Sequence, residues 1–524
     1  MPLSPRSGSA AHPLLRAVGT ISFFTLVSRI FGFVRDVVIA RGFGSGMGAD
    51  AFFVAFKLPN FLRRLFAEGA MSTAFVPVFS DSLARGNVEE TREVVHTVFT
   101  ALTAALMILV VLAELGMPWL ILVTAPGFSD QPEKMQLAID LTRITFPYIL
   151  LISLVSLAGG ILNSHKRFAI PAATPVLLNV FLILGALLLS PLLEEPVMGL
   201  AWGVLAGGVA QLALQLPALS RIGMSFRLRW DPRHPALRRI LKLMGPSILG
   251  VSAVQINLLF DIFLASWLPE GSISYLYYAD RLVEFPLGLI GIAMGTAILP
   301  ALSAKAAVGD LKGMGTDLSF ALRMVLFINL PATVGLLVLR EPILALLFQR
   351  GAFDAAATDL TSRALFAYGL GLLAFSGIKV LAPAYYSMQD TRTPVRFGLI
   401  SVAVNMACNV ILMFPLQHVG LALATTIAAY VNAFLLLVHL QRKVGFRPGR
   451  ELWVTALKTL AACLAMGATL HYGGELYLTG DLGTWARALR LLAVIAVGCG
   501  VFFVTARLLG CREMGELRAA FSRR

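Results

Sequence analysis

Charge is scarce in this sequence. Only 14% of its 524 residues are Asp, Glu, Lys or Arg, whereas 57% are hydrophobic. A soluble domain has about 25% charged residues and is about half apolar. The polar side chains are therefore too few to cover a soluble globule of this length, and the composition predicts a membrane protein.

Paired cysteines and catalytic motifs are also lacking. The seven histidines are scattered, and neither H-E-x-x-H nor G-x-S-x-G occurs. No acidic pair has the spacing of metal ligands. We therefore predict no catalytic residues, no cofactor and no enzyme activity. The cysteines show no C-x-x-C spacing and support neither a disulfide framework nor a zinc site: Cys408, Cys463, Cys499 and Cys511.

Apolar runs of about 18 to 25 residues, in contrast, recur along the whole chain. The strands of a membrane barrel alternate in polarity and give a much weaker signal. The runs therefore predict an all-α polytopic membrane protein. Boundaries set by Gly, Pro and charge give about fourteen transmembrane helices, near residues 15–40, 50–82, 95–124, 136–162, 170–191, 196–217, 240–268, 273–304, 316–339, 357–388, 395–415, 417–440, 452–471 and 486–510.

Lys and Arg gather in every second connection, roughly twenty-five residues against three in the alternate connections. The three are Lys134, Arg340 and Arg350. Because cytoplasmic loops are enriched in basic residues, we predict that both termini are cytoplasmic. This placement explains most of the net charge of +14 by topology and anionic lipid headgroups, so we expect no nucleic-acid partner.

The two halves of the sequence resemble each other at an offset of about 220 residues. Residues 74–77 match 297–300, and residues 174–176 match 393–395. Each repeat would hold six helices, and transporters built in this way bind their substrate between the repeats. We therefore expect four segments, which are an N-lobe (1–220), an amphipathic cytoplasmic linker (221–239), a C-lobe (240–442) and two C-terminal helices with a basic tail (443–524).

Ionisable residues lie inside the predicted helices. Each would cost about 2.5 to 3.5 kcal/mol at the centre of a lipid-facing helix, so together they must pair or line a water-filled cavity. They are Arg29, Arg35, Asp36, Asp50, Lys57, Arg63, Arg64, Glu68, Asp261, Asp280, Arg281, Glu284 and Lys379.

Two interpretations of these charges remain. In the first, ion pairs lock helices together, with Arg29 beside Asp36 on one helix face and Arg281 beside Glu284 one turn along. In the second, arginine in excess of its acidic neighbours binds an anion, and the planar guanidinium group suits phosphate oxygens. The excess in the first two helices favours a phosphorylated substrate.

A second cluster is rich in oxygen. Asp261, Asn405, Asn409 and Thr425 lie on three predicted helices. Their oxygen atoms would suit a hard cation such as Na⁺. Hydrogen bonds between helices explain the same residues equally well.

Several long motifs resemble the MurJ (MviN) family of lipid II flippases over nearly the whole chain. They are residues 28–36, 50–60, 63–70, 277–286 and 379–387. The resemblance implies the fourteen-helix fold of the multidrug/oligosaccharidyl-lipid/polysaccharide exporter superfamily, with two six-helix lobes around a central cavity. It also implies a bacterial inner-membrane protein that moves lipid II, the undecaprenyl-pyrophosphate-linked precursor of peptidoglycan, to the periplasmic leaflet.

The resemblance also implies which residues contact the substrate. The important cavity charges of the family match Arg29, Arg35, Asp50, Arg63 and Arg281. Family members are associated with a Na⁺ site, although Asn409 stands here where an acidic ligand can occur. We expect coupling to the membrane potential, Na⁺ or H⁺, and membrane lipids and the cell-wall synthesis machinery as partners. The supporting cavity residues would be Asp36, Lys57, Asn60, Arg64, Glu68, Asp280, Glu284 and Lys379.

Three alternatives remain open. A cation-coupled drug exporter of the same superfamily should have an acidic and aromatic cavity, whereas arginine prevails here. Another exporter of the superfamily would carry a different polyprenyl-linked oligosaccharide. A membrane enzyme acting on polyprenyl-linked sugars would need a catalytic carboxylate and a metal or donor site, and the short outer connections offer neither.

Overall fold

The structure is a computed structural model, and it describes residues 11–65, 71–445, 449–478 and 483–522. Within these ranges the chain is helical, with short turns and no strand. It forms two compact units, Met1–Glu270 and Gly271–Arg524. The fold is therefore all-α, as the apolar runs predict.

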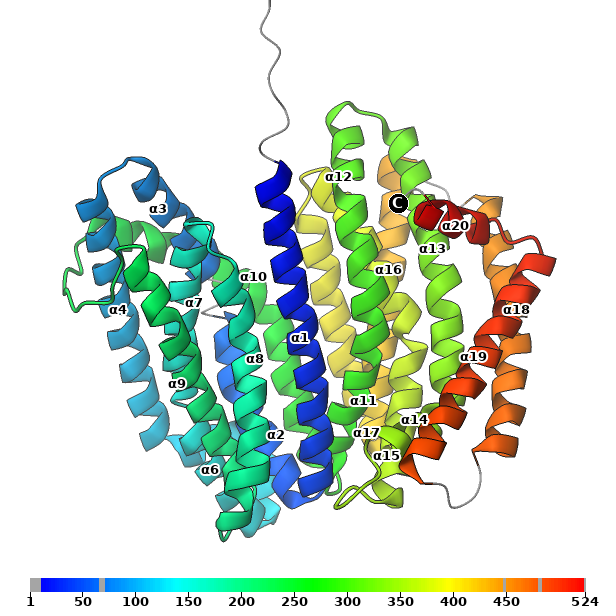
Figure 1. Cartoon of the computed structure of the whole chain (residues 1–524), viewed down its shortest axis with the longest axis horizontal. Coiled ribbons are helices and arrows are strands. Elements are labelled where there is room, and N and C mark those ends of the chain that lie inside the picture. The colour runs from blue at the N-terminus through cyan, green and yellow to red at the C-terminus, as the bar shows by residue number, and fades with distance from the viewer. Residues whose placement is uncertain (1–10, 66–70, 446–448, 479–482, 523–524) are drawn as a thin grey trace, which may run out of the picture. The chain divides into compact units, whose positions relative to one another are not determined.

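The first unit contains ten α-helices and, besides a π-helical turn at residues 63–65, three short segments of 3-10 or π-helix among its described residues (Figure 1). They are α1 (Ala11–Phe43), α2 (Met47–Leu62), α3 (Ser72–Ala84), α4 (Val88–Leu115), α5 (Met117–Thr124), η2 (Pro126–Asp130), α6 (Pro132–Thr145), α7 (Tyr148–Ser164), α8 (Ala169–Leu184), η3 (Gly185–Leu189), η4 (Ser190–Leu192), α9 (Met198–Arg221) and α10 (Pro235–Ala265).

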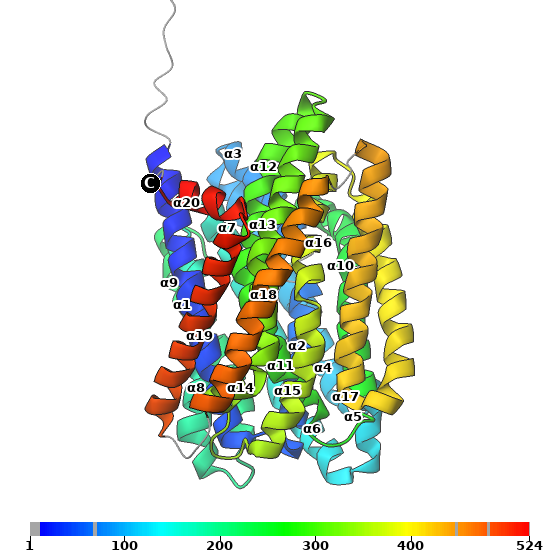
Figure 2. The same cartoon turned by 90° about the vertical axis from the view of Figure 1, so that its right-hand side faces the viewer.

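The second unit contains ten α-helices and one π-helical segment in the part that the structure describes (Figure 2). They are α11 (Ser272–Pro286), η5 (Leu287–Ile292), α12 (Ala293–Ala307), α13 (Leu311–Val338), α14 (Arg340–Leu347), α15 (Ala355–Leu370), α16 (Leu372–Ser387), α17 (Arg392–Val444), α18 (Arg450–Tyr477), α19 (Thr484–Leu508) and α20 (Glu513–Ser522).

Several predicted helices are interrupted where the backbone cannot continue regularly. The predicted helix 95–124 is divided at Gly116, and 136–162 is divided near Pro147, which lacks the N–H that an inner helical position needs. The two helices predicted at 395–415 and 417–440 fall within one element, α17. Gln417 has a φ of 51° and breaks α17 close to the predicted boundary. The two short helices α14 and α20 have too few apolar residues for the search for long runs to find them.

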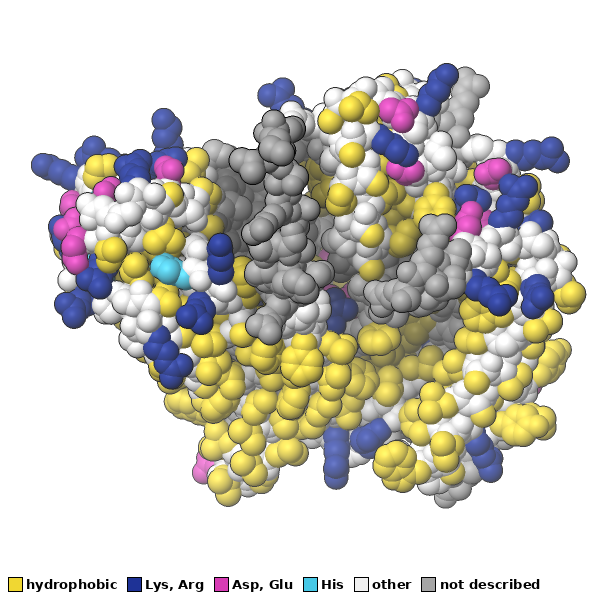
Figure 3. Space-filling view, turned by 45° about the horizontal axis from the view of Figure 1, so that its top comes forward, with side chains coloured by type: hydrophobic (Ala, Val, Ile, Leu, Met, Phe, Trp, Pro, Cys, Tyr) yellow, Lys and Arg dark blue, Asp and Glu magenta, His cyan; other side chains and the backbone are white. Residues whose placement is uncertain are grey.

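Nine helical stretches among the described residues are long and apolar enough to cross a membrane. Large apolar side chains lie on their outer faces, as with Leu112 and Phe434, which are 62% and 64% exposed. In Figure 3, hydrophobic side chains cover broad areas of the surface, and many Lys and Arg side chains lie along the upper edge of the view. The chain is therefore a multi-pass membrane protein. The helix count of fourteen stays a prediction.

Small residues let the helices of the first unit pack closely. Gly199, Gly203 and Gly207 recur every four residues on α9; Gly203 and Gly207 face α8, and Gly199 faces the segments η3 and η4 that follow it. A Cβ atom at Gly203 would lie 2.8 Å from the carbonyl oxygen of Phe181. Any larger residue would push the two helices apart, so these glycines fix the position of α8, which carries Asn179 of the candidate site.

The helix α10 packs against α3 and belongs to the first compact unit. The sequence repeat assigns most of the same segment to the C-lobe. The two compact units are defined by how the residues pack, whereas the lobes are defined by similarity between the two halves of the sequence. The lobe boundaries therefore remain a prediction.

In the second unit, α18 and α19 pack against α13. Phe327 of α13 contacts Phe502 of α19, with 5.4 Å between the ring centroids. Met466 and Leu470 of α18 belong to the same buried cluster. The two helices that follow the predicted repeat are thus held by an apolar core of their own.

Candidate functional site

The predicted charges on α1 fall into two kinds, exposed and buried. Arg29 is exposed and makes no ion pair or hydrogen bond with any residue that the structure describes. Arg35 and Asp36 are only 8% and 2% exposed. One Asp36 carboxylate oxygen accepts hydrogen bonds from two guanidinium nitrogens of Arg35, at 3.0 and 2.7 Å. The predicted pairing of Arg29 with Asp36 is therefore wrong, because the adjacent residue takes the carboxylate.

Asn179 of α8 holds the far side of this pair. The Arg35 guanidinium donates to the Asn179 side-chain oxygen at 2.9 Å, and the Asn179 amide nitrogen donates to the Ser28 carbonyl oxygen at 3.1 Å. Arg35 is thus fixed by a carboxylate on its own helix and by the Asn179 amide on α8. Asn179 was not predicted, since a lone Asn in an apolar run has no motif that distinguishes it.

Asp50 on α2 forms the second buried ion pair. It is 1% exposed, and its carboxylate accepts a hydrogen bond from the Lys134 ammonium at 2.9 Å. Lys134 is 3% exposed and lies 4.5 Å from the ring centroid of Phe128, which adds a cation–π contact. Lys134 was predicted to lie in an outer connection; it belongs instead to α6, whose first turn carries this ammonium group into the interior.

The end of α2 carries the next predicted group. Asn60 accepts a hydrogen bond from the Arg63 guanidinium at 3.1 Å. Arg63 and Arg64 lie in a π-helical turn that follows α2, where Arg63 is half-buried and Arg64 is exposed. π-helical turns are frequent at functional sites because they redirect side chains. Lys57 is half-buried on α2, and Glu68 lies outside the described residues.

A similar arrangement occurs on α11 in the second unit. The half-buried Arg281 donates to the Glu284 carboxylate at 2.7 Å, so the predicted pair at this spacing is confirmed. Its guanidinium carbon lies 4.9 Å from the Tyr277 ring centroid. The π-helical segment η5 begins three residues after Glu284, at Leu287. Asp280 is exposed on the same helix.

Lys379 of α16 resembles Arg29. It is exposed, and no described residue pairs with it. Beside it, α12 and α16 approach closely, since a Cβ atom at Gly295 would lie 2.2 Å from the Lys379 carbonyl oxygen. The backbone of Lys379 is thereby fixed while its ammonium group stays accessible.

The oxygen-rich cluster is present in part. Asn409 donates to the Asn405 side-chain oxygen at 3.0 Å, and Asn405 donates to the Thr425 hydroxyl at 3.3 Å. These three residues join the two halves of α17, and both asparagines are buried. Asp261 is half-buried on α10 in the first unit. These hydrogen bonds agree with the interpretation that the polar residues connect helices. The same side chains also present oxygen atoms that could bind a cation.

Chemically, the site residues supply fixed and accessible positive charge. Arg35 and Lys134 are neutralised by Asp36 and Asp50, and burial makes each pair costly to break. Arg29, Arg64 and Lys379 are exposed cations that could bind an anionic group directly. No cluster of His, Cys, Asp and Glu suited to a metal occurs among the described residues.

Known sequences resemble this chain over nearly its whole length. The profile of the family described as lipid II flippase MurJ matches residues 39–491. A probable lipid II flippase MurJ from Vibrio cholerae is 43% identical over 516 residues, which is 97% of this chain and 98% of the relative.

Solved structures give the same result. A lipid II flippase MurJ in an inward closed conformation aligns with a TM-score of 0.78 at 29% identity, covering 93% of this chain and 98% of its own. An inward-facing multidrug transporter of the MATE family and MOP superfamily aligns at 0.64 and 18% identity over 82% of this chain and 98% of its own. The second match concerns the fold alone.

Proposed function

Because the chain belongs to the lipid II flippase MurJ family, we propose that it moves lipid II from the cytoplasmic to the periplasmic leaflet by alternating access. One observation carries this function: the similarity to a MurJ relative extends over 97% of this chain and 98% of that relative. A match of this extent concerns the whole transporter rather than a shared part. The protein is accordingly a transporter and not an enzyme.

Arginine side chains would bind the pyrophosphate and sugar headgroup. Arg29, Arg63 and Arg281 are accessible or half-buried and carry guanidinium groups suited to phosphate. Arg35 and Asp50 would act through their buried pairs, which fix the helices that carry the other charges. Lys57, Asn60, Arg64, Asp280, Glu284 and Lys379 would support this site.

The architecture belongs to the same proposal. The protein would have fourteen transmembrane helices in two six-helix lobes, with α18 and α19 appended and both termini in the cytoplasm. The basic connections support this orientation, since the linker between α9 and α10 alone carries Arg227, Arg229 and Arg233. A bacterial inner membrane would hold it, with lipid II and membrane lipids as partners and the cell-wall synthesis machinery nearby.

The membrane potential or an ion gradient would bias the return step. One charge crossing 100 mV corresponds to about 2.3 kcal/mol, so a cavity with excess arginine responds to the potential. Na⁺ would bind at Asn405, Asn409, Thr425 and Asp261 if it is the coupling ion, and H⁺ is the alternative.

Depletion with leaflet-specific labelling tests this function. In cells whose own flippase is depleted, expression of this chain should restore lipid II to the outer leaflet, where an added label reaches it. Collapsing the membrane potential should slow that recovery. Lipid II trapped inside despite normal insertion of the protein would refute the flippase. In the depleted cells before this chain is expressed, precursor that already accumulates outside would indicate that a polymerase, and not a flippase, is missing.

A further inference from the structure

A pocket of about 220 Å³ lies where α18 begins and α19 has just ended. Both helices are candidate membrane spans, so the pocket lies at a membrane surface. The pocket is smaller than the about 300–1,000 Å³ typical of ligand sites, which suits a small headgroup. The charged residues of its lining are Arg323, Arg450, Glu451, Lys458, Arg512 and Glu513.

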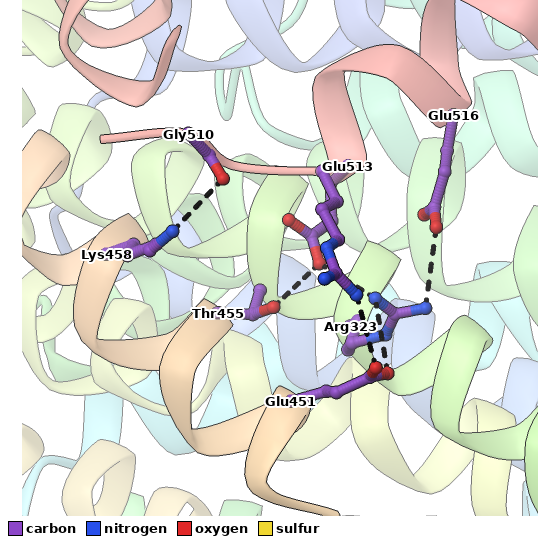
Figure 4. A network of polar contacts seen from close by, with 8 residues as sticks. Arg323, Glu451, Thr455, Lys458, Gly510, Glu513 and Glu516 are labelled. Atoms are coloured by element: carbon purple, nitrogen blue, oxygen red, sulfur yellow. Dashed lines mark hydrogen bonds and ion pairs between the residues drawn. The ribbon is translucent and has the colours of Figure 1, made fainter. Parts of the chain in front are cut away.

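A buried arginine organises one wall. Arg323 of α13 is 8% exposed and lies 3.3 Å from the Glu513 carboxylate and 3.5 Å from that of Glu516, both on α20 (Figure 4). The Thr455 hydroxyl donates to the same Glu513 carboxylate at 2.6 Å. α20 is thus attached to α13 and α18 by buried polar contacts, which give the pocket a built wall rather than a collection of surface side chains.

The charges of the lining do not cancel. The Glu513 carboxylate forms an ion pair with Arg323, and the Glu451 carboxylate lies 3.3 Å from the Arg512 guanidinium. Lys458 donates to the Gly510 carbonyl oxygen, which is uncharged, at 3.1 Å. Arg450 has no ion pair with any described residue. Two cations, Arg450 and Lys458, are therefore left without a carboxylate.

The backbone and the buried arginine add further donors. Arg450 is the first residue of α18, and its N-cap residue Gly449 supplies no side-chain hydrogen bond. The first N–H groups of a helix, together with its dipole, favour an anion at that end. In addition, the buried Nε of Arg323 has no partner in the described part of the chain.

Apolar side chains lie next to these donors. Trp453 and Leu457 on the adjoining face of α18 are 66% and 67% exposed, and Leu508 at the end of α19 is 81% exposed. Tryptophan is enriched at the membrane–water interface. A free phosphate ion would gain nothing from this apolar surface, whereas acyl chains would cover it.

We infer that this pocket binds the phosphate headgroup of an anionic phospholipid, with the acyl chains lying against Trp453, Leu457 and Leu508. Arg450 and Lys458 contact the phosphate, and Arg323 holds the wall that α20 forms. The lipid thereby links α18 to the C-terminal helix α20. The site is separate from the residues assigned to lipid II and does not depend on transport.

Native mass spectrometry of the purified full-length protein tests the site. The probes are phosphatidylglycerol, phosphatidylcholine and inorganic phosphate. The double variant R450Q/K458Q should bind phosphatidylglycerol about thirtyfold more weakly than the unmodified protein, since each of the two basic residues contributes about 1 kcal/mol near a membrane. The matched control R227Q/R233Q removes the same charge from the exposed linker and should bind normally.

The outcomes separate the two sources of phosphate. Retention of phosphatidylglycerol over phosphatidylcholine, lost only in R450Q/K458Q, supports the site. Equal losses in both double variants, or equal binding of the two lipids, would overturn it. Displacement of the lipid by inorganic phosphate at the same concentration would also overturn it, because the pocket would then take the free ion. Arg450→Glu, at an exposed position, should weaken binding at least as much without affecting folding.

Discussion

Two arginines on α1, six residues apart, have opposite environments. Arg35 is buried between Asp36 and Asn179, whereas Arg29 is exposed and unpaired among the described residues. The same residue type thus holds helices together at one position and remains accessible at the other. Motifs alone do not separate these roles, because both arginines match the family pattern equally well. The difference predicts that substitutions will divide into those that change stability and those that change transport.

The largest loss of stability is expected at the Asp50–Lys134 pair. Asp50→Ala should lower the free energy of unfolding by about 3–5 kcal/mol, because it leaves the Lys134 ammonium buried without its carboxylate. Thermal unfolding of the purified protein measures this. The double variant Asp50→Leu with Lys134→Met should recover much of the loss, since it removes both charges. A single variant as stable as the unmodified protein would contradict the buried pair.

A smaller loss is expected at Asn179. Asn179→Ala removes the acceptor for the Arg35 guanidinium and should cost about 1–3 kcal/mol, the range for a buried donor left unsatisfied. The same unfolding measurement applies. Asn163→Ala, a polar residue near the end of α7, serves as control and should change stability by less than about 0.5 kcal/mol. Equal effects of the two substitutions would show that the Arg35 contact contributes nothing specific.

The partly exposed pair Asp390–Lys443 lies between the two extremes. Its hydrogen bonds from Lys443 and Thr393 hold the pKa of the Asp390 carboxyl below its usual range. A lowered folded-state pKa stabilises the protein above the unfolded value of about 3.9, and this contribution disappears as the pH falls through the folded value. Asp390→Asn should therefore be less stable by under about 1 kcal/mol at pH 7, and the difference should shrink below about pH 4. A constant difference across that range would contradict the ion pair.

The smallest effect on stability is expected at Arg29. Arg29→Ala removes an exposed side chain without a described partner, so unfolding should shift by no more than about 0.5 kcal/mol. A larger shift, measured beside Arg41→Ala on the same helix, would show that Arg29 has a structural role after all.

Much of the fold follows from composition and apolar periodicity, and the superfamily follows from the motifs. The interruption at Gly116 depends on local backbone geometry, which apolar runs do not encode, whereas the break at Gln417 lies at the boundary between two predicted helices. Lys134 was assigned to a loop because the sequence around it is polar. Its partner Asp50 lies 84 residues away, so the sequence near Lys134 does not indicate the ion pair. The Arg323 network was missed for the same reason, since its members come from α13, α18 and α20. Contacts of such long range cannot be found from spacing along one chain.

Leaflet-resolved lipid II labelling in depleted cells that express Arg29→Ala tests most directly whether Arg29 binds the substrate. We expect normal insertion, normal stability and lipid II trapped in the cytoplasmic leaflet, because an accessible guanidinium that binds phosphate has been removed. Arg41→Ala, the control, should restore labelling at the outer leaflet. Normal outer-leaflet labelling with Arg29→Ala would contradict the claim that Arg29 binds the substrate.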